Sequence, residues 1–175
     1  GQDKFVREML KNKKNGFFID IGCYQPITIS NTYLLEIEDG WTGIGIDIMD
    51  HFEESNLKEN NSSKHWADLR PNTKHIIADA VSIDYSALFK LHKVPSIVDY
   101  LSLDIEPPDA TLKVLFKLPL DDYKFRVITF ETDEYRDSNG RYREEKSREY
   151  LKTKGYKYIK TINQQDDFYI HPELV

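Results

Sequence analysis

The sequence predicts a single doubly wound α/β domain, with a mostly parallel sheet, helices on both faces and an antiparallel hairpin at the carboxyl end. Three observations support this class. Short apolar runs rich in β-branched and aromatic residues alternate with longer amphipathic segments. No internal repeat or long Pro/Gly/Ser linker interrupts the alternation. With 39% hydrophobic residues, the 175-residue chain can also build one substantial core. We therefore expect residues 1–175 to form one domain, alone or within a longer chain.

The expected elements follow in order along the chain. The first ten residues form a short helix, and five buried strands come next: FFIDI (17–21), GIGID (43–47), HIIAD (75–79), DYLSLDI (99–105) and FRVITFE (125–131). Helices are expected at 30–39, 50–59, 84–92, 109–118 and 143–154, the last of them before the helix-ending residue Gly155. The final strands, YKYIKTI (156–162) and DFYIH (167–171), flank NQQDD and predict the hairpin. Strands that alternate with helices pair in parallel through right-handed crossovers, which gives the sheet.

One polar stretch, residues 55–74, fits this alternation poorly. It carries turn-forming residues at Asn60–Ser63 and at Pro71–Asn72. We expect it to be a surface excursion before the third strand, with Trp66 packed onto the core.

Composition limits the classes of partner. The net charge of −6 and the pI near 5.4 argue against the basic surface that nucleic acid or an anionic membrane requires. No apolar run approaches the roughly 20 residues of a membrane span. Cys23 is the only cysteine and the five histidines lack paired ligand spacing, so a zinc site is not expected. These features predict a soluble, cytoplasmic protein without a nucleic-acid partner.

Acidic residues end every predicted strand of the parallel sheet. In such sheets, ligands bind beyond the carboxyl ends of the strands. A single acid at a strand end often serves only to cap a helix, but a complete set predicts a ligand site. The set comprises Asp20, Asp47, Asp79, Asp104 with Glu106, and Glu131 with Asp133.

The first three acids indicate an adenosine-containing cofactor. Asp47 ends the second strand, where a carboxylate can accept hydrogen bonds from a ribose diol. Asp79 is placed to meet an adenine amino group. The turn after Asp20 reads GCYQP and lacks the glycine-rich pattern that a pyrophosphate needs. This pattern disfavours NAD and FAD and favours S-adenosylmethionine.

The chain resembles the FkbM-like branch of S-adenosylmethionine-dependent methyltransferases. The blocks that carry the resemblance are GQDKFV, GFFIDIG, SNTYLLE with GWTGIGID, DYLSLDIEPP, and FRVITFETDEYR, in that order. The resemblance implies a Rossmann-like class I methyltransferase fold and O-methylation. It also implies an acceptor that is a sugar hydroxyl of a glycan or a glycosylated natural product. A non-catalytic binding or assembly module with the same fold is the alternative.

The resemblance further implies roles for individual residues. Asp20 and Gly22 line the methionine and ribose end of the cofactor, and Asp47 holds the ribose hydroxyls. Pro26 departs from the pattern, since a glycine or another small residue is expected there. The remaining cofactor residues are Asp79 and Ala80 near the adenine, and Ser30 and Asn31 at a helix start that receives the methionine carboxylate.

Four carboxylates at the ends of the last two parallel strands are the candidate catalytic residues: Asp104, Glu106, Glu131 and Asp133. A hydroxyl is a poor nucleophile at neutral pH, so it needs a general base or a metal ion. Three interpretations stay open. Asp104, Glu131 and Asp133 hold Mg²⁺, Mn²⁺ or Ca²⁺; or crowding creates a metal-free base of raised pKa; or Glu131 and Asp133 only pair with Arg126, Arg136 or Arg141. Asp104 is the leading catalytic candidate.

Overall fold

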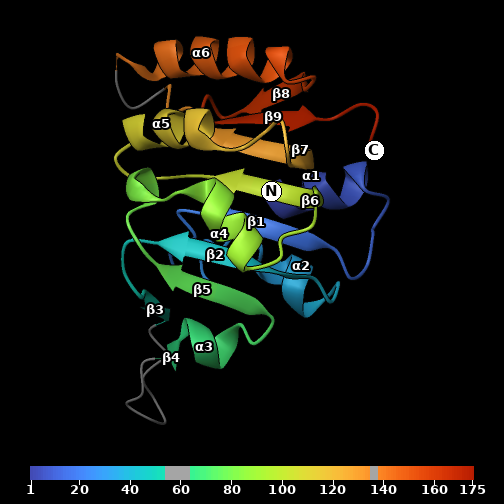
Figure 1. Ribbon diagram of the computed structural model, residues 1–175, viewed down its shortest axis with the longest axis vertical. Helices are drawn as coiled ribbons and strands as arrows, with labels where there is room; N and C mark the ends of the chain where they lie inside the picture. Colours follow the sequence, from blue (N-terminus) through green and yellow to red (C-terminus); the bar gives the residue numbers. More distant parts are fainter. Residues whose placement is uncertain (54–63, 135–137) are drawn as a thin grey trace.

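The computed structural model describes residues 1–53, 64–134 and 138–175, which form a seven-stranded sheet with helices on both faces (Figure 1). The strand order is β5-β2-β1-β6-β7-β9-β8. The bounds are β1 Phe17–Ile21, β2 Thr42–Asp47, β5 Thr73–Ile77, β6 Ile97–Leu103, β7 Lys124–Glu131, β8 Lys157–Ile162 and β9 Asp166–Ile170. The first five pair in parallel, and β9 runs antiparallel to β7 and β8. The predicted sheet and hairpin are confirmed.

Two hydrophobic cores cover the two faces of the sheet. On one face, Phe18 and Tyr100 pack with Phe5 of the first helix and Leu35 of the second. On the other face, Ile19 and Leu101 pack with the remaining long helices. Successive strand residues point to opposite faces, which is why neighbours in β1 belong to different cores. The helices are α1 Gln2–Met9 and α2 Tyr33–Ile37 on the first face, and α4 Tyr85–Leu91, α5 Asp109–Lys117 and α6 Gly140–Thr153 on the second.

Two expected helices differ from the structure. The helix expected at 30–39 is only α2, because the Ser30 hydroxyl accepts from Tyr33 N and Thr32 N and starts the helix later. In the segment 50–59, residues 54–59 lie outside the described part. The preceding β3 (Phe52–Glu53) is extended and pairs with β4 (Lys64–His65), so this segment does not begin as a helix.

The surface excursion expected at 55–74 contains more regular structure than predicted in the residues that the structure describes; Asn60–Ser63 lie outside them. Its exposed residues include Ala67, Asp68, Pro71 and Asn72. Residues 66–69 form the short helix α3 (Trp66–Leu69), and β5 already begins at Thr73. Trp66 is buried, as expected, and the Arg70 side chain is completely buried beside it. The polar composition of this stretch did not reveal that Arg70 is buried beside Trp66.

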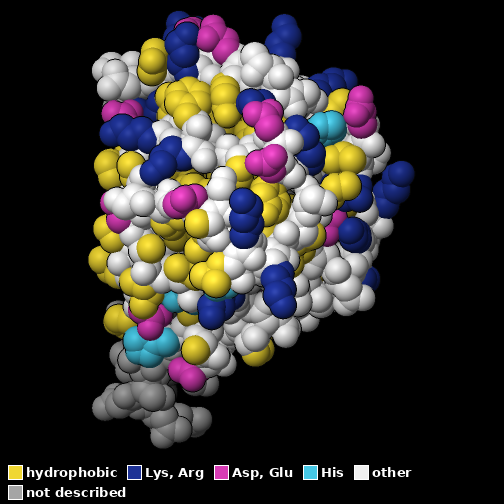
Figure 2. All heavy atoms as spheres, viewed as in Figure 1, with side chains coloured by type: hydrophobic (Ala, Val, Ile, Leu, Met, Phe, Trp, Pro, Cys, Tyr) yellow, Lys and Arg dark blue, Asp and Glu magenta, His cyan; other side chains and the backbone are white. Residues whose placement is uncertain are grey.

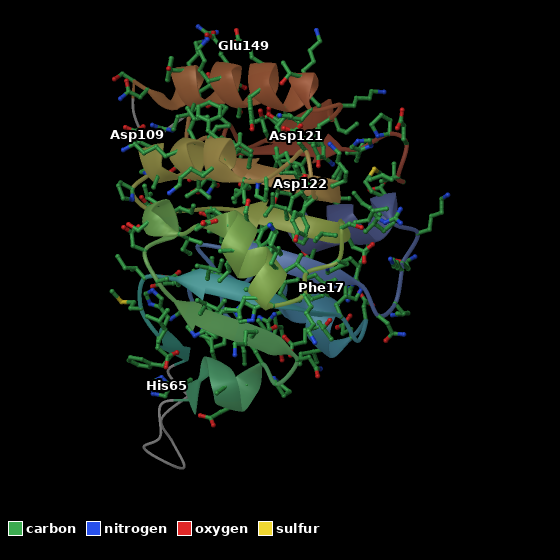
Figure 3. The ribbon with its side chains drawn as sticks, viewed as in Figure 1. Phe17, His65, Asp109, Asp121, Asp122 and Glu149 are labelled. Carbon is green, nitrogen blue, oxygen red and sulfur yellow. The ribbon has the colours of Figure 1, made fainter. Side chains whose placement is uncertain are left out.

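The carboxyl ends of the parallel strands share one edge, on the left in Figure 1. Figure 3 labels His65 and Asp109 at this edge, towards its two ends, and Phe17 at the opposite edge where β1 begins. Among the described residues, no helix has the length and apolar character needed to cross a membrane.

Candidate active site

The chain leaves β1 through Gly22, which presses against the next strand end. Gly22 has a φ of +83°, and a Cβ there would lie 1.7 Å from the Asp104 carbonyl oxygen. Its N–H donates to Ile46 O at 2.8 Å, while Asp104 N donates to Ile21 O at 3.0 Å. The ends of β1, β2 and β6 are thus joined through one glycine. Only a residue without a side chain permits this approach.

A chain of polar side chains links the end of β1 to the end of β6. Asp20 is completely buried, and its Oδ2 accepts from Thr32 Oγ1 at 2.8 Å. Burial raises the pKa of Asp20, an effect that the Thr32 hydroxyl opposes. The neighbouring Asn31 donates from Nδ2 to Ser102 Oγ at 3.1 Å and towards Asp104 Oδ2 at 3.4 Å. Asn31 therefore connects the predicted cofactor end to the predicted catalytic end.

Asp47 lies at the end of β2 and organises the loop that follows β1. Its two oxygens accept from Tyr24 N at 2.9 Å and from Ile48 N at 2.7 Å. His51 Nε2 lies 3.3 Å from Asp47 Oδ1, and the His51 ring packs on Tyr24 with centroids 4.4 Å apart. A carboxylate has about four lone-pair sites, so these contacts leave Asp47 capacity for a diol.

The other predicted cofactor residues have local roles as well. Asp79 caps the 3₁₀ helix η1 (Ala80–Ser82), accepting from Val81 N at 3.0 Å and Ser82 Oγ at 2.7 Å. The Ser82 hydroxyl is the main reason that the pKa of Asp79 is lowered. Ala80 is buried, and its carbonyl oxygen accepts from Tyr85 OH. No hydrogen bond among the described residues joins Asp79 to the other predicted cofactor residues, so it stands apart at the end of β5.

A carboxyl pair, the half-buried Asp104 and the buried Glu131, occupies the ends of β6 and β7. Each of the two carboxyl groups affects the pKa of the other. Burial and this partner raise the pKa of Glu131 to about 8, and burial raises the pKa of Asp104. Two neighbouring carboxylates repel each other when both are ionised, so the pair favours a state in which one of them is protonated. The pair is therefore best treated as one titrating unit.

Sequence reasoning missed two residues of the β9 hairpin that face this pair. Gln165 Nε2 donates to Glu131 Oε1 at 3.1 Å, and Asp166 lies opposite Glu131 in the β7–β9 ladder. Burial, followed by the charge of Glu131, raises the pKa of Asp166 to about 6. The segment NQQDD could have predicted this contact. Because β9 runs antiparallel to β7, the acids and amides at its start lie at the carboxyl edge of the sheet.

The other two predicted catalytic carboxylates differ from each other. Asp133 is completely buried in the loop after β7, with φ at +50°, whereas Glu106 is exposed. The buried Arg143 of α6 holds that loop: its Nε donates to Thr132 O at 2.9 Å and its Nη2 to Asp133 O at 3.5 Å. Nη1 of the same side chain donates to Asp109 Oδ1 at 2.8 Å.

Of the arginines in the structural-pairing interpretation, Arg126 pairs elsewhere. Arg126 Nε lies 3.0 Å from Asp99 Oδ1 near the amino end of β6, away from Glu131. Arg136 lies outside the described residues. Over the ranges 1–53, 64–134 and 138–175, no group of three or more His, Cys, Asp or Glu side chains is arranged to hold a metal ion. The divalent cation thus gains no support from the geometry.

The raised pKa of Glu131 predicts a pH-dependent stability. Its folded-state pKa of about 8 exceeds the ordinary 4.5, so the folded state binds the proton more tightly. The free energy of unfolding should therefore fall as pH rises from about 4.5 to 8. Glu131→Gln supplies a permanent donor to Asp104 and should raise the free energy of unfolding at pH 8 by about 2 kcal/mol. Urea unfolding at pH 5 and pH 8 tests this, and equal effects at both pH values would contradict it.

Hydrophobic side chains are exposed around the cofactor end of the edge. Figure 2 shows such side chains along the left half of the molecule, with Lys and Arg side chains scattered over the same face. The exposed apolar residues after β1 and β2 and at the last position of β5 are Tyr24, Ile29, Ile48, Met49, Phe52 and Ile77.

Comparisons with known proteins identify the fold. No family model matches the chain, and no curated protein matches it. A proposed rRNA methylase from Clostridium thermocellum aligns with 16% identity and a TM-score of 0.57, over 96% of this chain and 93% of that one. A proposed ribosomal RNA methyltransferase from Plasmodium falciparum gives 14%, 0.52, 95% and 91%, and the METTL16 methyltransferase domain gives 13%, 0.52, 95% and 78%. The chain therefore has the Rossmann-like class I methyltransferase fold, whereas the FkbM-like resemblance stays a prediction.

The exclusion of nucleic acid as a partner was wrong. Two of these structures, which share the fold over nearly their whole length, are described as ribosomal RNA methylases. Net charge is a sum over the whole chain, but contact with nucleic acid depends on the local charge where the strand lies. A value of −6 consequently does not separate this fold from RNA-modifying proteins.

Proposed function

We propose that this chain is an S-adenosylmethionine-dependent methyltransferase that acts on a hydroxyl oxygen of a sugar. The observation that carries the proposal is the carboxyl edge of the sheet. There Thr32 donates to buried Asp20, and the next residue back, Asn31, donates to Ser102 and towards Asp104 of the carboxyl pair. This arrangement supports a cofactor end beside a base. The shared fold with methyltransferases supports the same reading.

The described residues fit an adenosyl cofactor. Asp20 Oδ1 is buried and accepts no hydrogen bond from the described residues, which suits a cationic amino group. Asp47 ends β2 with spare acceptor capacity for a ribose diol. Gly22 removes any side chain from the turn between them. When bound, S-adenosylmethionine supplies a methyl carbon already activated by the sulfonium, so the protein has to align the acceptor and take its proton.

The carboxyl pair is suited to accept the proton of the acceptor hydroxyl. A base works best when its pKa lies near the operating pH, and burial raises the pKa of Asp104 above its ordinary value. With a pKa of about 8, Glu131 keeps its proton at pH 7, so the Asp104 carboxylate is the group that accepts the proton of an acceptor hydroxyl. Gln165 keeps Glu131 oriented through the 3.1 Å hydrogen bond to Oε1. No step here requires a metal ion.

Two acceptors fit a sugar hydroxyl. The FkbM-like resemblance favours a glycan or a glycosylated natural product. RNA is the second candidate, because its ribose also carries a hydroxyl and because two structures of this fold are described as ribosomal RNA methylases. Labelled S-adenosylmethionine incubated with oligosaccharides and with total RNA separates them. Running both reactions with a chelator tests the divalent ion.

Cofactor binding is the first test. Isothermal titration should show binding of S-adenosylmethionine and of S-adenosylhomocysteine, but not of NAD, because the turn after β1 lacks the approach that a pyrophosphate needs. We expect a dissociation constant of about 1–100 μM, a range typical of metabolite binding. No heat with S-adenosylmethionine, together with an unchanged melting temperature, would refute the proposal. Tight binding without transfer to either acceptor class would favour the non-catalytic module.

A further inference from the structure

Arg70 lies in a stretch that looks like surface loop, yet its side chain is completely buried. It follows α3 and contacts the loop between β1 and α2. Its Nη1 donates to Pro26 O at 2.8 Å and to Ser30 Oγ at 3.1 Å, and its Nη2 donates to Thr32 Oγ1 at 3.0 Å. One guanidinium therefore holds the loop at three points.

The guanidinium is itself rigidly held. Arg70 Nε donates to Glu36 Oε2 at 2.5 Å, and both side chains are fully buried. Glu36 also accepts from Asn72 N at 2.8 Å and from Thr73 Oγ1 at 2.5 Å. The Trp66 ring lies 4.8 Å from the Arg70 guanidinium carbon. A planar donor fixed by an acid and a ring has little freedom left, so it can define the shape of whatever it binds.

The held loop is the one that carries the predicted cofactor residues. Thr32 passes the contact on to Asp20, because Thr32 Oγ1 donates to Asp20 Oδ2. Trp66 adds a fourth point, since its Nε1 donates to Tyr24 O at 2.8 Å. Arg70 thus reaches both Ser30 and, through Thr32, the buried Asp20.

We propose that Arg70 is a positioning residue for the cofactor loop, residues 22–32. Its hydrogen bonds fix the backbone path of this loop, a role that the glycines have in a glycine-rich turn. This inference rests on the proposed function. It also accounts for Pro26, whose carbonyl faces inward to the guanidinium. A proline at this place leaves the loop one N–H fewer to satisfy and fixes φ, which removes one flexible backbone dihedral from the loop.

Two variants and a matched control test the proposal. Arg70→Lys keeps the charge beside Glu36 but loses the planar fork, so affinity for S-adenosylmethionine should fall by about ten-fold. The double variant Arg70→Gln/Glu36→Gln removes both buried charges together, which is less costly than stranding one, and should weaken binding similarly. Thr73→Val removes the hydroxyl that donates to Glu36 and accepts from Arg70 Nη2 at 3.5 Å, while every contact of Arg70 with the loop remains. It should lower the melting temperature and leave the affinity unchanged.

Calorimetry at a temperature where every variant is folded separates positioning from stability. Weakened binding in an Arg70 variant, with Thr73→Val at wild-type affinity, supports the inference. Wild-type affinity in either folded Arg70 variant, or an equal loss in Thr73→Val, overturns it. Absence of binding in the wild-type protein would instead count against the proposed function.

Discussion

Asp104→Asn is expected to reduce methyl transfer by about a hundred- to ten-thousand-fold, the usual contribution of a general base. The amide is nearly the same shape as the carboxylate, and its oxygen can still accept from Asn31 Nδ2. Its N–H₂ can donate to Glu131, so the folded state should survive. What disappears is the ability of the pair to accept a proton. Turnover is measured with the acceptor that becomes labelled in the screen, and cofactor affinity by calorimetry.

Asp84→Asn is the matched control for this variant. Asp84 is exposed and caps α4 by accepting from Ala87 N, a role that Asn fills about equally well. It should keep both activity and stability. Because Asp104 and Glu131 act as one unit, the double variant with Glu131→Gln should be no slower than the slower single variant. Retained turnover in Asp104→Asn would remove the carboxyl pair from the mechanism.

Gly22→Ala is expected to be the most damaging single substitution in the cofactor loop. Its Cβ would lie 1.7 Å from the Asp104 carbonyl oxygen, so β1 and β6 could not keep their present ends. We expect a loss of about 3 kcal/mol or more in the free energy of unfolding, together with loss of cofactor binding. Urea unfolding followed by the fluorescence of buried Trp41 and Trp66 measures the first effect.

Gly155→Ala provides the comparison for Gly22→Ala. Gly155 has a similar φ of +88°, but the nearest atom to a Cβ there is His171 Nε2 at 3.5 Å, an ordinary contact. Its cost should be only the strain of a left-handed residue, about 1 kcal/mol. The difference between the two variants isolates the clash with β6. Equal losses would show that backbone conformation, and not the close approach, decides the role of Gly22.

The sequence predicts the sheet well because its strands are short, apolar and bounded by turns. FFIDI coincides with β1, and FRVITFE begins one residue inside β7. The acids follow the strand ends along one carboxyl edge because the strands are parallel, but Asp79 stands apart at the end of β5. These features depend on local pattern and on topology, and both can be read from a single chain.

Residues whose role depends on distant partners could not be predicted in this way. Arg70 stands in a polar stretch, and only folding brings Glu36 and Pro26 around it. Gln165 belongs to a turn by composition, yet it contacts Glu131 because β9 returns beside β7. Nothing in the spacing of these residues reports such contacts. The net charge likewise gave the wrong exclusion, since it carries no information on where charges lie.

Two buried arginines support the two loops of this edge in the same manner. Arg70 binds the carbonyl oxygen of Pro26, and Arg143 binds those of Thr132 and Asp133. A carbonyl oxygen is present whatever side chain its residue carries. The loops can therefore exchange many of their side chains during evolution or engineering, and so change what they recognise, while the two arginines preserve their paths.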